Sequence, residues 1–211
     1  MAEDTKDFPE IELEAPPVAD MTPGAGADLF SAESLSMIYA KLYIAEAFLR
    51  LAAKDCKFID FTRDVLLTAM RVVKSEAGSL FELDQKTNSL FFRAAAGASS
   101  DKIASFTVPM GQGIVGHVAE SRQPLVVSDA KENKVHLKKI DEAVGFETRN
   151  LVAIPLIVRG QLYGVLELLN RVGDGTYTKQ DVELLTYCAE MAAKAFEVRF
   201  MIAWALKGEA A

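Results

Sequence analysis

The side chains that most often bind metals or act as nucleophiles are few in this chain: Cys56, Cys188, His117 and His136. None of them lies at zinc-ligand spacing from another, so the sequence predicts no metal site. Both cysteines fall in stretches with helical periodicity and lie far apart, which argues against a disulfide framework. We therefore expect a reducing compartment, the cytoplasm. We place His117, partly buried, on a short helix and His136 in an exposed lid.

Three glycines, Gly111, Gly113 and Gly116, spell GxGxxG, the spacing of a dinucleotide-binding turn. The preceding segment Ser105–Met110 is short and alternating, and the surrounding segments have the pattern of hairpins rather than of strand–helix–strand units. No second mononucleotide-binding half follows in the sequence. We therefore interpret these glycines as the start of a tight helix and not as a cofactor site.

Charge is distributed unevenly along the chain. Its net charge is −7, yet residues 1–34 hold nine acids and one base, and the rest is nearly neutral. With several prolines and no periodicity, residues 1–32 are predicted to be an acidic, disordered leader. The remaining sequence has no basic stripe for nucleic acid, no apolar run that would span a membrane and no signal peptide. We expect one domain over residues 33–207.

Helical periodicity marks the two ends of this domain. Residues 33–54 carry a coiled-coil seam, residues 57–75 form a second helix, and a last helix runs from Thr178 to about Leu206 with apolar residues on two faces. Such helices need more than one partner, so we expect them to form a bundle or a dimer interface. The seam residues of the first helix are Leu35, Ile38, Leu42, Ala45, Leu49 and Ala52.

Between these helices the period changes to that of strands. Strands are predicted at Ala77–Leu83, Ser89–Ala95, Ile103–Val108, Pro124–Val127, Leu151–Val158 and Gln161–Leu169, with short helices at Gly113–Ser121 and 134–144. The order predicts an α+β fold: a central antiparallel sheet with the N- and C-terminal helices packed on one face. Residues 111–146, an irregular middle segment, are left to cover the other face, and residues 130–147 are expected to form a lid over a pocket there.

Three segments, Gly111–Ala130, Leu151–Val158 and Gly164–Arg171, followed by Tyr177 and Asp181, resemble GAF domains. The resemblance covers about residues 35–200 with the order of elements intact. It implies a GAF-like sheet with a ligand pocket beneath the lid. Within the family, the chain is most similar to the regulatory domains of cyclic-nucleotide phosphodiesterases and adenylyl cyclases.

Those domains carry an Asn-Lys, Phe, Asp-Glu signature, which this sequence keeps in altered form. Asn170 is retained, Arg171 replaces Lys, Tyr177 replaces Phe, Asp181 is retained, and Val182 replaces the final Glu. The resemblance implies an Arg171–Asp181 ion pair that ties the end of the sheet to the last helix. We expect this pair to be structural.

The resemblance also implies pocket positions for a cyclic nucleotide, cAMP or cGMP. Thr148 matches a ligand-contacting hydroxyl, Glu167 a pocket acid, and Ser128 and Asp129 lie near the purine-reading position. For three of these residues a purely structural role is the alternative to ligand contact. Asp129 would end a strand through an Asx-turn, Thr148 would be a β-branched strand residue, and Glu167 would face a helix dipole.

A cyclic phosphate needs backbone N–H groups at a helix N-terminus, which Gly113 and Ile114 would supply. The lid residues Val135–Val144 depart from the binding pattern of the family. The first hypothesis is therefore a regulatory sensor that binds a small molecule and signals through dimer geometry or a partner protein. The alternative is a ligand-free dimerisation module, with the pocket filled by Phe91, Phe92 and Phe146.

The resemblance also allows an enzymatic hypothesis, because one GAF lineage consists of free methionine sulfoxide reductases. That chemistry needs a reactive thiolate and a resolving thiol near the pocket. Cys56 and Cys188 are predicted on the terminal helices, outside the 111–150 region. No nucleophile–base motif, carboxylate pair or Walker loop is present in the sequence, and we expect the chain not to be an enzyme.

Overall fold

The structure is a computed structural model that describes residues 31–97, 106–130, 146–173 and 175–208. The predicted leader, apart from Ser31 and Ala32, the helix at 134–144 and His136 lie outside these residues. The described elements, in chain order, are α1 (Ala32–Ala53), α2 (Phe58–Val73), β1 (Ser75–Asp84), β2 (Ser89–Ala96), β3 (Thr107–Pro109), α3 (Gly113–Ser121), β4 (Leu125–Val127), β5 (Leu151–Val158), β6 (Gln161–Arg171) and α5 (Lys179–Gly208).

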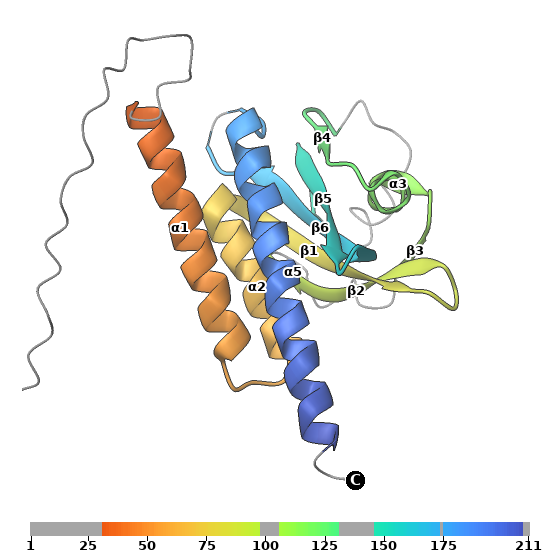
Figure 1. Cartoon of the computed structure of the whole chain (residues 1–211). Coiled ribbons are helices and arrows are strands. Elements are labelled where there is room, and N and C mark those ends of the chain that lie inside the picture. The colour runs from red at the N-terminus through yellow and green to blue at the C-terminus, as the bar shows by residue number, and fades with distance from the viewer. Residues whose placement is uncertain (1–30, 98–105, 131–145, 174, 209–211) are drawn as a thin grey trace, which may run out of the picture.

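The described strands form one six-stranded sheet in the order β3-β2-β1-β6-β5-β4. Every neighbouring pair is antiparallel, and β1 and β6 pair at the centre although they are far apart in the sequence. Helices α2 and α5 cover one face, α1 packs outside them against both, and α3 lies on the other face (Figure 1). The predicted α+β class with an antiparallel sheet and terminal helices on one face is confirmed.

The helix-covered face holds the main core. Because side chains alternate across a strand, Leu80, Ile154 and Leu166 point from β1, β5 and β6 toward the helices, where Phe61 and Phe196 are fully buried among them. The rings of Phe61 and Phe196 meet edge to face with centroids 5.0 Å apart. An aromatic cluster therefore joins α2 to α5 above the sheet.

The opposite face carries a smaller apolar cluster in which Phe81 and Val165 from the sheet pack under Val115 and Val118 of α3. The turn into α3 accounts for the GxGxxG spacing. Gly111 has a φ of +76°, and a side chain at Gly116 would lie 2.5 Å from the carbonyl oxygen of Pro109. These glycines are thus required by the turn itself.

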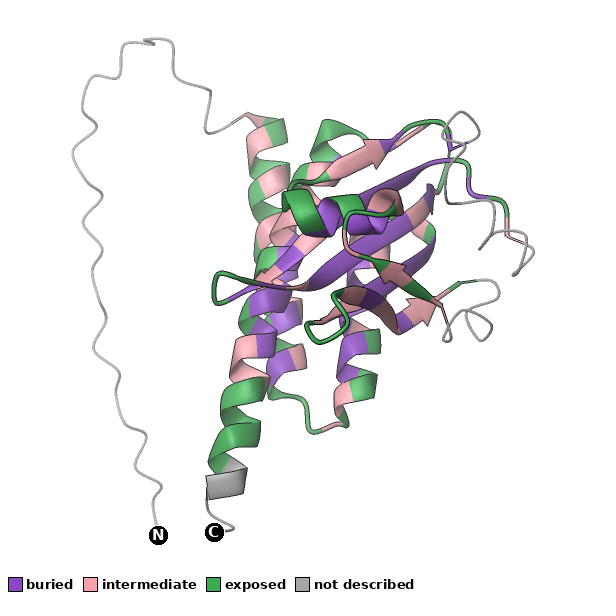
Figure 2. Ribbon diagram, turned by 90° about the vertical axis from the view of Figure 1, so that its right-hand side faces the viewer, coloured by how far each residue is buried: buried purple, intermediate pink, exposed green. Residues whose placement is uncertain are grey.

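Helix α1 divides its apolar residues between two faces. Ile44, Phe48 and Ala52 are buried against the domain. Ala52, assigned above to the seam, lies in the core of its own domain, because the helix turns that position inward. The outer seam positions are exposed, and so is the end of α5 (Figure 2). The exposed apolar residues are Leu35, Ile38, Tyr39, Leu42, Tyr43 and Leu49 on α1, and Phe200, Met201, Ile202 and Trp204 on α5.

Candidate functional site

Glu167 lies on the sheet face away from α1, α2 and α5. It belongs to β6, opposite Ser79 of β1 and Ala153 of β5. Its neighbours on the same strand face are Val165, which packs under α3, and Leu169. The glutamate is 7 % exposed. A carboxyl group is therefore buried between two apolar clusters of the sheet face that carries α3.

Thr148 and the Ser128–Asp129 pair come from two segments that meet at the β4 edge of the sheet. The N–H of Ala130 donates to the carbonyl of Arg149 at 2.8 Å, which joins the end of β4 to the segment before β5. Thr148 is buried, whereas Ser128 and Asp129 are exposed. The hydrogen bond brings together residues that are distant in the sequence.

The start of α3 reaches the same region. Ile114 packs against both apolar clusters on this face, the one under α3 and the one formed by Val127, Ala130 and Leu151. Gly113, with a φ of +62°, opens the helix. The first N–H groups of a helix have no partner within it, so this helix end can hold an anion. Of the six predicted ligand positions, Glu167 and Ile114 lie on this face of the sheet, Gly113 opens α3, and Thr148, Ser128 and Asp129 lie in the two segments that meet beside β4.

Two asparagines connect this region to the far end of β6. The side-chain Oδ1 of Asn170 accepts from the N–H of Arg149 at 2.7 Å, and Oδ1 of Asn150 accepts from the N–H of Arg171 at 3.0 Å. The N–H of Asn170 also donates to the carbonyl of Asn150 at 2.8 Å. Asn170 is buried, and its backbone has the left-handed conformation, with a φ of +55°. Asparagine tolerates this conformation better than most residues.

Glu76 of β1 extends the network in a way that the sequence did not reveal. Its carboxylate accepts from Arg149 at 2.7 Å and from Asn170 at 3.1 Å. The hydrogen bond from Arg149, reinforced by Asn170, holds the pKa of Glu76 below its usual value. Glu76 and Arg149 are 73 residues apart, so no local spacing could signal the pair.

Arg171 carries the network to α5. Its Nε donates to Oδ2 of Asp181 at 2.7 Å. Asp181 also accepts from the backbone N–H and the hydroxyl of Thr178, and Thr178 Oγ1 accepts from the Asp181 N–H, as in a capping box. Burial raises the pKa of Asp181, but the bonds from Arg171 and Thr178 outweigh burial and hold it below its ordinary value. The segment before β5 is thereby linked to the start of α5.

The two thiols lie on the other side of the sheet from Glu167. Cys188 is fully buried in the core beneath the helices, and burial raises its pKa to about 12. Cys56 packs against the same core. His117 is exposed on α3. Among the described residues, no group of three or more His, Cys, Asp or Glu side chains could hold a metal ion.

The phenylalanines proposed to fill the pocket separate in the structure. Phe92 packs against Phe81 beneath α3, with ring centroids 4.3 Å apart and the ring planes tilted by 43°. Phe91 alternates to the other face, where the guanidinium of Arg93 lies 4.9 Å from its ring centroid. Phe146 is half-buried in the segment before β5. Phe92 therefore occupies part of the face that carries Glu167, and Phe91 does not.

Comparison with known proteins agrees with this architecture. The GAF domain model matches residues 58–196. A probable 3′,5′-cyclic phosphodiesterase of Caenorhabditis elegans is 27 % identical over 56 % of this chain, and a dual cyclic-AMP and -GMP phosphodiesterase 11A of Takifugu rubripes is 28 % identical over 66 %. This chain spans 17 % of the length of either relative.

Solved structures of other proteins have the same fold. The GAF domain of a Coxiella burnetii phosphoenolpyruvate-protein phosphotransferase superposes with a TM-score of 0.62, 20 % identity and coverage of 82 % of this chain and 98 % of that one. A free methionine-R-sulfoxide reductase of Neisseria meningitidis superposes with a TM-score of 0.63 and 17 % identity. That match covers 82 % of this chain and 95 % of the reductase. From its family model, its relatives and its sheet, the chain belongs to the GAF domain family.

Proposed function

We propose that the chain is a regulatory sensor that binds a small molecule on the sheet face beneath α3. The observation that carries this proposal is the burial of Glu167 on the sheet face away from the helices, together with the burial of Thr148 in the segment before β5. A buried carboxyl and hydroxyl among apolar side chains provide the few fixed polar contacts that orient a small ligand. The relation to phosphodiesterases supports a role in signal transduction.

The ligand class that we propose is a cyclic nucleotide, cAMP or cGMP. Glu167, Thr148, Ser128 and Asp129 would offer hydrogen-bonding groups to a purine. The N–H groups of Gly113 and Ile114 would face the cyclic phosphate, since the positive end of a helix favours an anion. The names of the matched phosphodiesterases, which act on cyclic nucleotides, support this choice of ligand class.

The signal would pass from the pocket through the asparagine network to α5. Thr148 is adjacent to Arg149, whose N–H is held by Asn170, and Arg171 next to Asn170 holds Asp181 at the start of α5. A ligand that prefers one position of Thr148 would therefore bias the position of α5. The output would be the geometry of a homodimer formed through α1 and α5 in the cytoplasm, or a contact with a signalling partner.

The positions of the thiols support a regulatory rather than a catalytic role. A sulfoxide reductase needs a thiolate that reaches the bound substrate. Cys188 and Cys56 belong to the core on the opposite side of the sheet from Glu167. The described parts of the chain therefore bring no thiol to the proposed pocket.

Calorimetric titration with cAMP and cGMP tests the proposal. We expect binding that is weakened at least tenfold by Thr148→Val and by Glu167→Gln. Thr107→Val, a change at an exposed position of β3, should bind as the parent does. Thermal unfolding of each variant without ligand separates loss of binding from loss of folding. Absence of binding by the folded parent chain would overturn the cyclic-nucleotide assignment.

A ligand-free dimerisation module is the second candidate, and the packing of Phe92 on Phe81 favours it. These rings already fill part of the face beneath α3. On this proposal, a broad panel of metabolites leaves the unfolding temperature unchanged, while the chain still dimerises through α1 and α5. The two candidates are therefore separated by ligand stabilisation and not by oligomeric state.

A further inference from the structure

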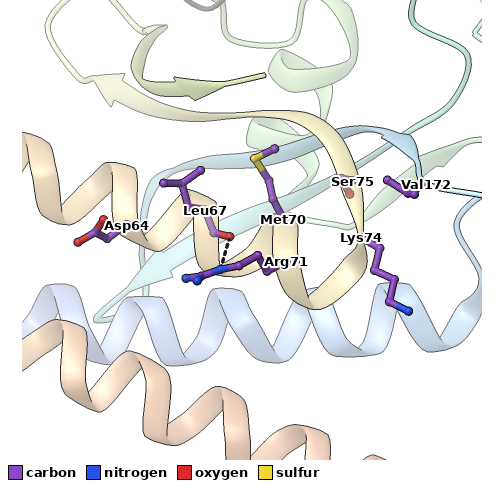
Figure 3. A pocket seen from close by; sticks show the side chains of 7 residues that line it. All are labelled: Asp64, Leu67, Met70, Arg71, Lys74, Ser75 and Val172. Carbon is purple, nitrogen blue, oxygen red and sulfur yellow. Dashed lines mark hydrogen bonds between the residues drawn. The ribbon is translucent and has the colours of Figure 1, made fainter. Parts of the chain in front are cut away.

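A groove lies on the helix side of the molecule, where α2 ends and β1 begins (Figure 3). Its volume is ≈ 610 Å³. Leu67, Met70 and Val172 give it an apolar floor, and Arg71 and Lys74 stand at its rim. Its remaining lining residues are Asp64 and Ser75. The groove is remote from the face that carries Glu167, so it is a separate surface.

The charge of this groove is positive and uncompensated by described residues. Arg71 bonds to the Leu67 carbonyl and to the Thr68 hydroxyl, both at 3.3 Å. Neither Arg71 nor Lys74 forms an ion pair with a carboxylate in the described part of the chain. The one acid of the lining, Asp64, forms an ion pair with Lys54, whose Nζ lies 2.6 Å from Oδ2 of Asp64. The groove therefore suits a segment that is both acidic and apolar.

The chain contains one such segment in its N-terminal part. Residues 8–14 read Phe-Pro-Glu-Ile-Glu-Leu-Glu, and residues 1–30 together hold eight acids and one base. In an extended conformation, alternate side chains point to opposite sides. Ile11 and Leu13 would then form an apolar edge, and Glu10, Glu12 and Glu14 an acidic one.

The groove is within reach of this segment. Helices α1 and α2 run antiparallel, so α2 ends toward the end of the molecule at which α1 starts (Figure 1). The 16 residues between Glu14 and Ser31 span up to roughly 53 Å when extended. Helix α1, with 22 residues, is about 33 Å long. The linking residues can thus span more than the full length of α1.

We propose that residues 8–14 dock in this groove of their own chain. Ile11 and Leu13 lie on the floor formed by Leu67, Met70 and Val172, and the glutamates pair with Arg71 and Lys74. Ser75 lines the same groove and accepts a hydrogen bond from the Tyr177 hydroxyl at 2.9 Å. The docked segment therefore contacts the junction between β1 and the residues that precede α5.

Zero-length carbodiimide cross-linking of the full chain, read by mass spectrometry, tests this docking. It joins carboxylates to lysine amines that are in contact. We expect Lys74 to be linked to Glu10, Glu12 or Glu14, at least fivefold more than Lys194, an exposed lysine of α5. Raised salt should lower the yield, because the contact is partly electrostatic and exposed to solvent.

Variants and isotope labelling decide the outcome. Arg71→Glu should lower the Lys74 cross-link at least fivefold, as should Ile11→Ser with Leu13→Ser. Arg122→Glu, an exposed position beyond α3, should leave it unchanged. A cross-link yield at Lys74 that is no higher than at Lys194 would overturn the proposal. So would a cross-link yield at Lys74 that Arg71→Glu leaves unchanged. Cross-links found only between differently labelled chains would overturn it in favour of docking on a second copy.

Discussion

The side chains of Asn150 and Asn170 each accept a hydrogen bond from the backbone of a residue adjacent to the other asparagine. Asn170 accepts from the N–H of Arg149 at 2.7 Å, and Asn150 accepts from the N–H of Arg171 at 3.0 Å. Asn170 also donates to the carbonyl of Glu147 at 2.9 Å. This exchange holds the segment that carries Thr148 against the end of β6.

Replacing Asn170 by alanine should destabilise the fold by about 3 kcal/mol, because buried backbone groups lose their partners and alanine disfavours the left-handed conformation. Urea unfolding at pH 7 measures the change. Asn88→Ala is the matched control, since Asn88 is also left-handed, with a φ of +51°, but is exposed in the β1–β2 turn. That variant should lose only about 1 kcal/mol. Equal losses in the two variants would contradict the role of the network.

Acid should weaken the link between β6 and α5. The pKa of Asp181 is lowered in the folded state. Its contribution to stability is therefore present above the unfolded value, about 3.9, and is lost as the pH falls through the folded value. Asp181→Asn should cost about 2 kcal/mol at pH 7, and its unfolding free energy should fall less steeply below pH 4. Unfolding by urea from pH 7 to 2.5 measures both effects. Asp55→Asn, at an exposed position between α1 and α2, should match the parent.

Helix α1 should govern self-association. A charge at Leu42, which is 61 % exposed on the outer face, would be buried without a partner in a helical seam. Leu42→Glu should therefore raise the dimer dissociation constant at least tenfold, measured by sedimentation equilibrium. Ile59→Glu changes an apolar residue of α2 with similar exposure, 51 %, and should have no such effect. A parent chain that is monomeric throughout the concentration range would refute dimerisation through this helix.

The two cysteines should differ in reactivity. Only thiolates react readily, and Cys188 is fully buried with a pKa raised to about 12. Cys56 is partly exposed. Titration with a disulfide reagent should modify one thiol per native chain, and two in urea. In Cys56→Ser, the native chain should show no fast reaction; a fast-reacting Cys188 would mean that the core around α5 opens readily.

The bounds of most elements were predictable because they follow from local patterns. Residues Gly113–Ser121 and Leu151–Val158 were predicted as observed. The apolar spacing of the first helix was also visible in the sequence, and its role as a seam between helices stays a prediction. The pattern did not say which apolar residues of that helix serve its own domain. Ala52 was assigned to the seam but is buried, since a helix with apolar residues on adjacent faces does not encode which face turns inward.

By itself, the sequence determined the α+β class, the alternation that puts Glu167 on one strand face with Val165, and the glycines of the turn into α3. These depend on side-chain period and on residues close in the chain. Only the tertiary structure decided that Glu76 meets Arg149, that Asn150 and Asn170 bind each other's neighbours, and that Arg71 and Lys74 frame a groove. Such contacts arise from the pairing of distant strands and helices, and no local pattern of residues records them.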